Sequence, residues 1–314
     1  MSQNLPAIEV MPRDLSAYRQ GNVGVDYVHR FESGVPGPHV LINALTHGNE
    51  FCGMVAACHL LDTSVRPVRG TLTVSFANVA AYETFDPTRP FDSRQITHNF
   101  NRIWSEEWLD GPQDSVELRR ARAMRSVVAG ADHILDIHST SQDVVPFWVY
   151  PDFARNARVA TALAAPAVHL VMPQGLGSGT PVIQHGQHGL ASSQAGAALV
   201  AECGQHFKQS TADLAVAVSL DFLGHFGLIE RVVRPAQTPR RFELLRTHVV
   251  AHADFRFTRP VIGFETFAQG ELIAMDGDQP IHAPCDDCTL FMPTREPIVG
   301  REGVYLTRPQ TPRP

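Results

Sequence analysis

The stretch HVLINALTHGNE, residues 39–50, joins an unbroken apolar run to a His-Gly-Asn-Glu turn. A continuous apolar run such as Val40–Leu45 is typical of a strand that is covered on both faces of its sheet. The pattern that follows over Glu50–Leu61 indicates a helix. A buried strand that leads through a sharp turn into a helix is one unit of an α/β fold.

Strands and helices alternate in the same way through the first two thirds of the chain. This alternation predicts an α/β fold with a mixed, largely parallel sheet flanked by helices. Further strands are predicted over Thr71–Ala77, Ile134–Ile137, Val144–Tyr150, Val168–Met172 and Ala197–Ala201, and further helices over Asp114–Val128, Phe153–Leu163 and Thr211–Phe226.

The character of the sequence changes after residue 233. Residues 234–241, RPAQTPRR, predict a linker, and short β-type runs separated by Gly, Pro and Asp follow it. A chain of 314 residues is long enough for two domains. We therefore expect an α/β domain over residues 1–233 and a second, smaller all-β domain over residues 234–314.

Composition excludes several classes of protein. The chain is 44% hydrophobic and carries a formal net charge of −6, so it has no basic excess with which to bind nucleic acid. It has no apolar run of about 18 residues, which argues against a membrane span. Without a secretory signal pattern, and with only five cysteines, it is expected in the cytoplasm.

Candidate metal ligands lie where two predicted strands end. His47 and Glu50 could reach one ion from a single turn, and His138 closes the strand that contains Asp136. Asp136 shares a strand face with His138 and could orient its imidazole. Catalytic zinc commonly has three protein ligands. Each signal alone also fits an ordinary polar helix cap or strand end.

Two further signals suggest catalysis. Glu202 follows the apolar strand AALVA and could act as a general base, although it could equally pair with an arginine. The loop at residues 91–104 holds Arg94, Asn101 and Arg102. One arginine there could bind a carboxylate through two hydrogen bonds, and another could polarise a carbonyl group. Loop arginines exposed to solvent are the alternative.

Other motifs are less specific. Cys285-x-x-Cys288 lacks the further ligands of a structural zinc site, so we expect a turn with two small buried side chains. His185 and His188 have a spacing that could suit a metal, but the strand ends already supply three ligands, and a loop role is expected.

Taken in order, these motifs resemble the succinylglutamate desuccinylase and aspartoacylase family, a branch of the zinc carboxypeptidase superfamily. The matching stretches in the first two thirds are THGNE (46–50), FNR (100–102) preceded by Arg94, DIHS (136–139) and ECG (202–204). The C-terminal part is similar in GELIA (270–274), HAPCDDCTLFMP (282–293) and GVYL (303–306).

The resemblance implies a zinc carboxypeptidase-like fold, a β-rich domain that caps the active site, and one catalytic zinc ion per chain. It implies hydrolysis of the amide of an N-acyl amino acid or a related small molecule that bears a carboxylate. The implied roles are zinc ligation by His47, Glu50 and His138, general base catalysis by Glu202, carbonyl polarisation by Arg94, and substrate binding by Asn101, Arg102 and Tyr305.

Two departures from the aspartoacylase pattern bear on the substrate: THNF stands before Asn101, and CGQH follows Glu202. The rival functions are a zinc carboxypeptidase, an esterase or deacylase acting on another small molecule, and a non-catalytic zinc- or ligand-binding protein. The expected partner is a small-molecule substrate, with no nucleic acid and no membrane, and a homo-oligomer stays open.

Overall fold

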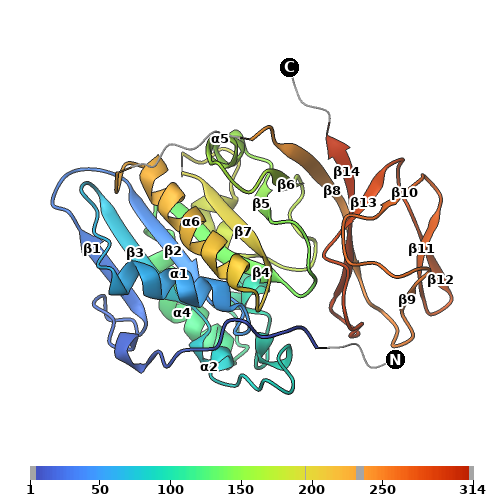
Figure 1. The fold of residues 1–314 in the computed structure, drawn as a ribbon, viewed down its shortest axis with the longest axis horizontal. Coiled ribbons are helices and arrows are strands. Elements are labelled where there is room, and N and C mark those ends of the chain that lie inside the picture. The colour runs from blue at the N-terminus through green and yellow to red at the C-terminus, as the bar shows by residue number, and fades with distance from the viewer. Residues whose placement is uncertain (1–4, 195, 231–236, 311–314) are drawn as a thin grey trace.

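The computed structural model describes residues 5–194, 196–230 and 237–310. Its strands form one sheet of eleven strands, in the order β1-β3-β2-β4-β7-β5-β6-β8-β14-β13-β10, and one of three, in the order β12-β11-β9 (Figure 1). Among the described residues, no helix is long and apolar enough to cross a membrane.

The predicted strands form the first part of the large sheet. Strands β3, β2, β4 and β7 run parallel, as do β5 and β6, whereas β5 pairs antiparallel with β7 and β1 with β3. This confirms the mixed, largely parallel sheet. The bounds are β1 Val28–Glu32, β2 His39–Ala44, β3 Thr71–Phe76, β4 His133–Thr140, β5 Phe147–Pro151, β6 Val168–Met172 and β7 Ala198–Gln205.

Strand β1 was not predicted from the sequence. It lies at the edge of the sheet, and four of its five residues are at least partly exposed, so its sequence VHRFE has no continuous apolar run.

Helices cover both faces of this sheet (Figure 1). Val40 and Ile42 on β2 pack in the core beneath α1 and α6, whereas Leu41 between them packs with Met124 of α4. Successive side chains of a strand point to opposite faces, which explains why β2 has apolar side chains on both of its faces. The helices are α1 Phe51–Asp62, α2 Val79–Tyr82, α3 Glu106–Leu109, α4 Val116–Ala129, α5 Ala154–Ala162 and α6 Gln209–His225.

The described residues after α6 contain strands and no helices, as predicted for the C-terminal part. Strands β9, β11 and β12 form the small separate sheet, whereas β8, β14, β13 and β10 extend the large sheet, because β8 pairs in parallel with β6. The bounds are β8 Arg240–Val249, β9 Arg256–Phe257, β10 Thr266–Phe267, β11 Leu272–Asp276, β12 Gln279–His282, β13 Cys288–Phe291 and β14 Glu302–Gln310.

The predicted domain boundary after residue 233 lies outside the described residues, as does the start of the predicted linker, residues 234–236. The C-terminal strands nonetheless have a core of their own, which includes Phe255, Ile273, Leu290 and Leu306. The division into two domains stays a prediction, because the large sheet runs through both parts.

A buried carboxylate at the end of β11 holds the loop that follows β8. Asp276, at the end of β11, is 1% exposed and accepts hydrogen bonds from the N–H groups of Ala251 (2.8 Å) and His252 (2.7 Å). Its Oδ2 also lies 2.8 Å from Nε2 of His248. Burial opposes ionisation of this group, but these donors outweigh it and lower the pKa of Asp276 to about 2.

We expect Asp276→Asn to lower the free energy of unfolding by about 2 kcal/mol at pH 7, because charged hydrogen bonds are lost. A carboxyl group with a lowered pKa stabilises the fold above its ordinary pKa, and this stabilisation is lost as pH falls toward about 2. The difference in free energy of unfolding between Asp276→Asn and the parent protein should therefore become smaller below pH 4.

Urea unfolding at pH 7, 5 and 3.5 measures this difference. Asp278→Asn, an exposed neighbour, is the matched control and should change little. A difference for Asp276→Asn that stays constant from pH 7 to 3.5 would contradict this account.

Candidate functional site

The site lies at one edge of the large sheet. His47 and Glu50 occupy the turn between β2 and α1, His138 lies near the end of β4, and Glu202 lies on β7. Strands β2, β4 and β7 are parallel neighbours, and His138 is the register partner of Glu202. Because parallel strands end at the same edge, side chains separated by up to 155 positions meet there.

The predicted metal ligands converge in the structure. Glu50 Oε1 lies 2.8 Å from His47 Nδ1, and Glu50 Oε2 lies 2.9 Å from His138 Nδ1. One ligand atom from each of the three residues lies within 4.8 Å of the others, and all three side chains are buried. Two imidazoles and one carboxylate are a donor set that suits a catalytic zinc ion.

The second ring nitrogen of each histidine also lies within hydrogen-bond distance of a side-chain oxygen. Asp136 Oδ2 lies 2.7 Å from His138 Nε2, and Asn99 Oδ1 lies 3.0 Å from His47 Nε2. Asp136 in turn accepts hydrogen bonds from Asn43 and Thr46. Such contacts fix the ring orientation of metal ligands. The structure thus brings Asp136 to the predicted place and adds Asn99, to which sequence analysis assigned no role.

The charges within the group favour a cation at its centre. Burial opposes the charged form of every member, yet Asp136 and Glu50 raise the pKa of His138, and the two imidazoles lower the pKa of Glu50. Burial lowers the pKa of His47 to about 4, so this imidazole is neutral at pH 7. A neutral imidazole and an ionised carboxylate are the forms that ligate metal.

Glu202 has an unpaired oxygen beside this group. Its side chain is buried, and Oε2 has no hydrogen-bond partner among the described residues. Burial raises its pKa, against the opposing effect of His138. A buried polar atom without a partner is rare and calls for an explanation. Here the carboxylate faces a cavity, where it can exchange a proton with a bound molecule.

Arg94 reaches the site from a short 3-10 turn, Asp92–Arg94. Its Nη1 lies 3.3 Å from Glu50 Oε1, and the side chain lines the cavity. The backbone holds it there, because the Gly48 N–H donates to the Arg94 carbonyl oxygen at 3.1 Å. A Cβ on Gly48 would lie 2.4 Å from the Ser93 carbonyl oxygen, so this close approach requires glycine.

Asn101 and Arg102 lie behind the cavity wall. Arg102 Nε donates to Glu302 Oε1 at 2.6 Å, and Arg102 Nη2 donates to the Tyr305 hydroxyl at 3.0 Å. Asn101 Oδ1 accepts from the Val182 N–H at 3.0 Å. Of these residues, Glu302 and Tyr305 line the cavity. The guanidinium predicted to bind a substrate carboxylate is therefore paired with a carboxylate of the protein.

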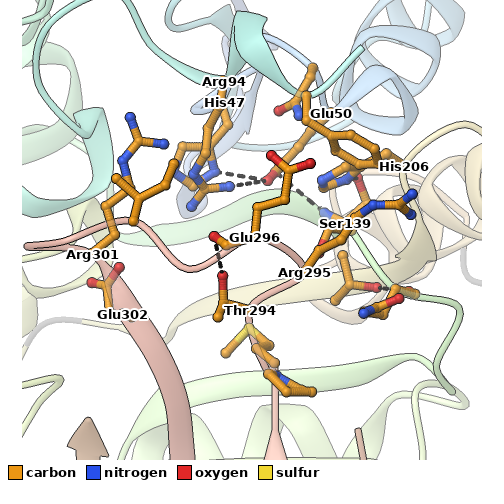
Figure 2. A pocket seen from close by; sticks show the side chains of 18 of the residues that line it. His47, Glu50, Arg94, Ser139, His206, Thr294, Arg295, Glu296, Arg301 and Glu302 are labelled. Atoms are coloured by element: carbon orange, nitrogen blue, oxygen red, sulfur yellow. Dashed lines mark hydrogen bonds and ion pairs between the residues drawn. The ribbon is translucent and has the colours of Figure 1, made fainter. Parts of the chain in front are cut away.

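The cavity has a volume of about 510 Å³, and both parts of the chain line it. One wall is formed by the strand ends and the loop that carries Arg94, and the other by residues 292–305, which lie across it (Figure 2). Figure 2 shows Arg295, Glu296 and Arg301 on that second wall. Sequence reasoning missed these side chains, because only the tertiary fold brings the segment to the site.

Sequence reasoning also missed a Ser-His pair. Ser139 Oγ and His206 Nδ1 lie 2.8 Å apart, and both residues line the cavity. The Ser139 N–H also points to Glu50 Oε2 at 3.3 Å. Burial lowers the pKa of His206 to about 3, so its imidazole is neutral. The stretch ECGQH, in which His206 follows Glu202 by four positions, was the available signal.

The remaining histidines and cysteines that the sequence singled out lie elsewhere. Nδ1 of His185 lies 2.9 Å from the carbonyl oxygen of Trp104, and Nε2 of His188 lies 3.0 Å from that of Ala131. Cys285 and Cys288 are free thiols. Across the described ranges, His47, Glu50 and His138 form the only group of three or more side chains placed to hold a metal ion.

Comparison with known proteins finds similarity to one enzyme family. The model of the succinylglutamate desuccinylase/aspartoacylase catalytic domain matches residues 36–219. A curated relative, the succinylglutamate desuccinylase of Vibrio vulnificus, is 30% identical over 114 residues. That match covers 35% of this chain and 33% of the relative, so it spans about a third of the relative's length.

Solved structures share the fold over nearly the whole chain. The succinylglutamate desuccinylase from Vibrio parahaemolyticus has a TM-score of 0.69 at 18% identity, with 92% of this chain and 87% of that chain covered. The ectoine utilization protein EutE (DoeB) from Ruegeria pomeroyi has a TM-score of 0.64 at 16% identity, with 90% and 88% covered. Since the family model matches more than half of the sequence, the chain belongs to the succinylglutamate desuccinylase/aspartoacylase family, a family of deacylases.

Proposed function

We propose that this protein is a zinc-dependent amidohydrolase that cleaves the amide of an N-acyl amino acid or a related small molecule bearing a carboxylate. One observation carries the proposal: Glu202, whose buried Oε2 has no hydrogen-bond partner among the described residues, lines the same cavity as His47 and Glu50 of the cluster formed with His138. A metal cluster alone would suit a binding protein, whereas a buried carboxylate aimed at the same space suits proton transfer.

His47, Glu50 and His138 would hold one zinc ion per chain. Zinc bound by these side chains would supply Lewis acidity, which lowers the pKa of a water molecule and polarises a carbonyl group. The ion would remain accessible from the cavity, because His47 and Glu50 both line it. Asp136 and Asn99 would keep the imidazole nitrogens turned toward Glu50, as they do in the structure.

Glu202 would act as general base and then as general acid. Its carboxylate takes a proton from the attacking water and later gives a proton to the departing nitrogen, so that an amine leaves rather than an amide anion. Its low exposure favours this exchange, since burial makes the protonated and ionised forms of a carboxyl group closer in free energy near neutral pH.

Arg94 would stabilise the negative charge that develops on the carbonyl oxygen. Its guanidinium is anchored by Glu50 yet lines the cavity, so it can donate a further hydrogen bond. The substrate carboxylate would lie near Tyr305, whose hydroxyl is held by Arg102. Asn101 supports this region through its carbonyl oxygen, which accepts from Arg102 Nη1 at 2.7 Å.

We propose the cytoplasm as the compartment. All five cysteines are free thiols in the structure, and reduced cysteines are typical of that environment.

Replacement of Glu202 tests the catalytic proposal. We expect Glu202→Gln to lower kcat for amine release by about 10²–10⁴-fold, because the proton acceptor is lost while the side chain keeps its shape. The measurement is amine release from N-acetyl, N-succinyl and N-formyl amino acids, with dipeptides and amino-acid amides included. Zinc content should stay at one per chain.

The control for this variant is Glu107→Gln, an exposed glutamate on α3. Amine release that survives in Glu202→Gln would refute the assigned role of Glu202. Faster cleavage of dipeptides than of N-acyl amino acids would indicate a peptidase instead.

Removal of zinc tests the metal site separately. A chelator should abolish amine release, and added zinc should restore it, because the side chains alone cannot activate water sufficiently. His138→Ala should hold less than a tenth of the zinc that the parent protein holds. Loss of a metal ligand, or of a group that orients one, strongly weakens metal binding. Metal content per chain is measured by mass spectrometry.

His282→Ala, which removes an exposed histidine of β12, is the matched control and should retain one zinc per chain. Full zinc content in a folded His138→Ala protein would show that the metal binds elsewhere.

A further inference from the structure

We propose that the substrate carries an apolar group, which lies against the outer wall of the cavity. This inference rests on the proposed function and narrows its substrate class. The apolar group belongs either to the acyl chain or to the amino-acid side chain. Both have the same chemistry, and the experiment below distinguishes them.

The outer wall of the cavity carries exposed apolar side chains among its polar ones. The described residues include three exposed isoleucines, and all three line this cavity: Ile96 is 46% exposed, Ile262 53% and Ile298 43%. Single exposed apolar residues are ordinary, whereas apolar residues gathered around one site mark a binding surface. They come from both parts of the chain, since Ile96 lies in the loop that carries Arg94.

Further apolar side chains make this wall continuous. A Cβ built on Gly263 would lie 2.9 Å from Val144 Cγ1 and 3.6 Å from Pro293 Cδ, so the backbone beside Ile262 packs directly against both. Met292 also lines the cavity. The apolar surface therefore extends from the C-terminal part to the loop after β4, next to the metal cluster.

The size of the cavity leaves room for such a group. Its volume of about 510 Å³ lies within the range of about 300–1,000 Å³ that is typical of pockets for drug-sized ligands. Near the metal cluster the wall is polar, with Glu50, Glu202 and Arg94. The reacting amide would lie at this polar end, and the remaining space is bounded by the isoleucines.

The charges argue against a second carboxylate in that space. Glu302 already pairs with Arg102 at 2.6 Å, and this contact leaves the pair with no net charge. Asp92 and Glu296 add two further carboxylates to the lining. The guanidiniums of Arg94, Arg295 and Arg301 also line the cavity, and Arg94 already pairs with Glu50 at 3.3 Å. An additional anionic arm would also lie near the carboxylates of Asp92 and Glu296 and the isoleucines.

The experiment is a pair of substrate series with the zinc-loaded full chain. One series varies the acyl group of glycine through acetyl, butanoyl and hexanoyl, and the other varies the amino acid of N-acetyl substrates from glycine to norvaline and norleucine. We expect kcat/KM to rise at least tenfold along one series, because each added methylene buries apolar surface. The series that rises identifies the group that contacts the isoleucines.

Variants test the assigned wall. Ile298→Ser and Ile262→Ser should each reduce the ratio of kcat/KM between the longest and shortest substrates at least threefold. Val68→Ser, which changes an exposed valine that does not line the cavity, should leave this ratio unchanged. N-pentanoylglycine should be cleaved at least tenfold faster than N-succinylglycine, which has a similar length but ends in a carboxylate.

Two outcomes would overturn the inference in different ways. If short substrates are cleaved with dependence on Glu202, but neither series rises or the succinyl compound is preferred, the apolar assignment fails and the proposed function stands. If no member of either series releases amine, the proposed function fails and the inference fails with it.

Discussion

The site depends on the buried carboxylate of Glu50. An ionised carboxylate that is 1% exposed is costly unless it is paired, and here four groups face it: His47, His138, Arg94 and the N–H of Ser139. These groups come from the turn after β2, the end of β4 and the loop between α2 and α3. This one charge therefore holds three segments of the chain together. The same contacts position the side chains of His47 and His138 next to Glu50.

The cavity has two walls because the large sheet continues from the α/β part into the C-terminal strands. Strand ends β2, β4 and β7 supply the metal cluster and Glu202, whereas the C-terminal strands extend the same sheet through β8 and bring residues 292–305 over the site. The substrate that we propose would lie between these walls, with its amide near the metal cluster and its apolar group against the isoleucines.

Much of the site could be predicted from the sequence, because its signals are local. THGNE, DIHS and ECG each end an apolar strand, and parallel pairing brings strand ends together whatever the remaining sequence. The pairing of Arg102 with Glu302 could not be predicted in this way, since 200 positions separate the two residues. The same holds for Ile298 and Arg301, whose loop has no distinctive pattern and gains its role only by packing over the cavity. The extension of the sheet through β8 also escaped prediction, because a Pro- and Arg-rich linker is compatible with either a separate or a shared sheet.

X-ray diffraction from crystals of the zinc-loaded protein, at wavelengths on both sides of the zinc absorption edge, would locate the metal ion. We expect one anomalous peak per chain, about 2.0–2.2 Å from nitrogen atoms of His47 and His138 and an oxygen of Glu50, with Glu202 beside it and not bound to it. A peak bound by other residues, or a fully active crystal without a peak between these three side chains, would contradict the account.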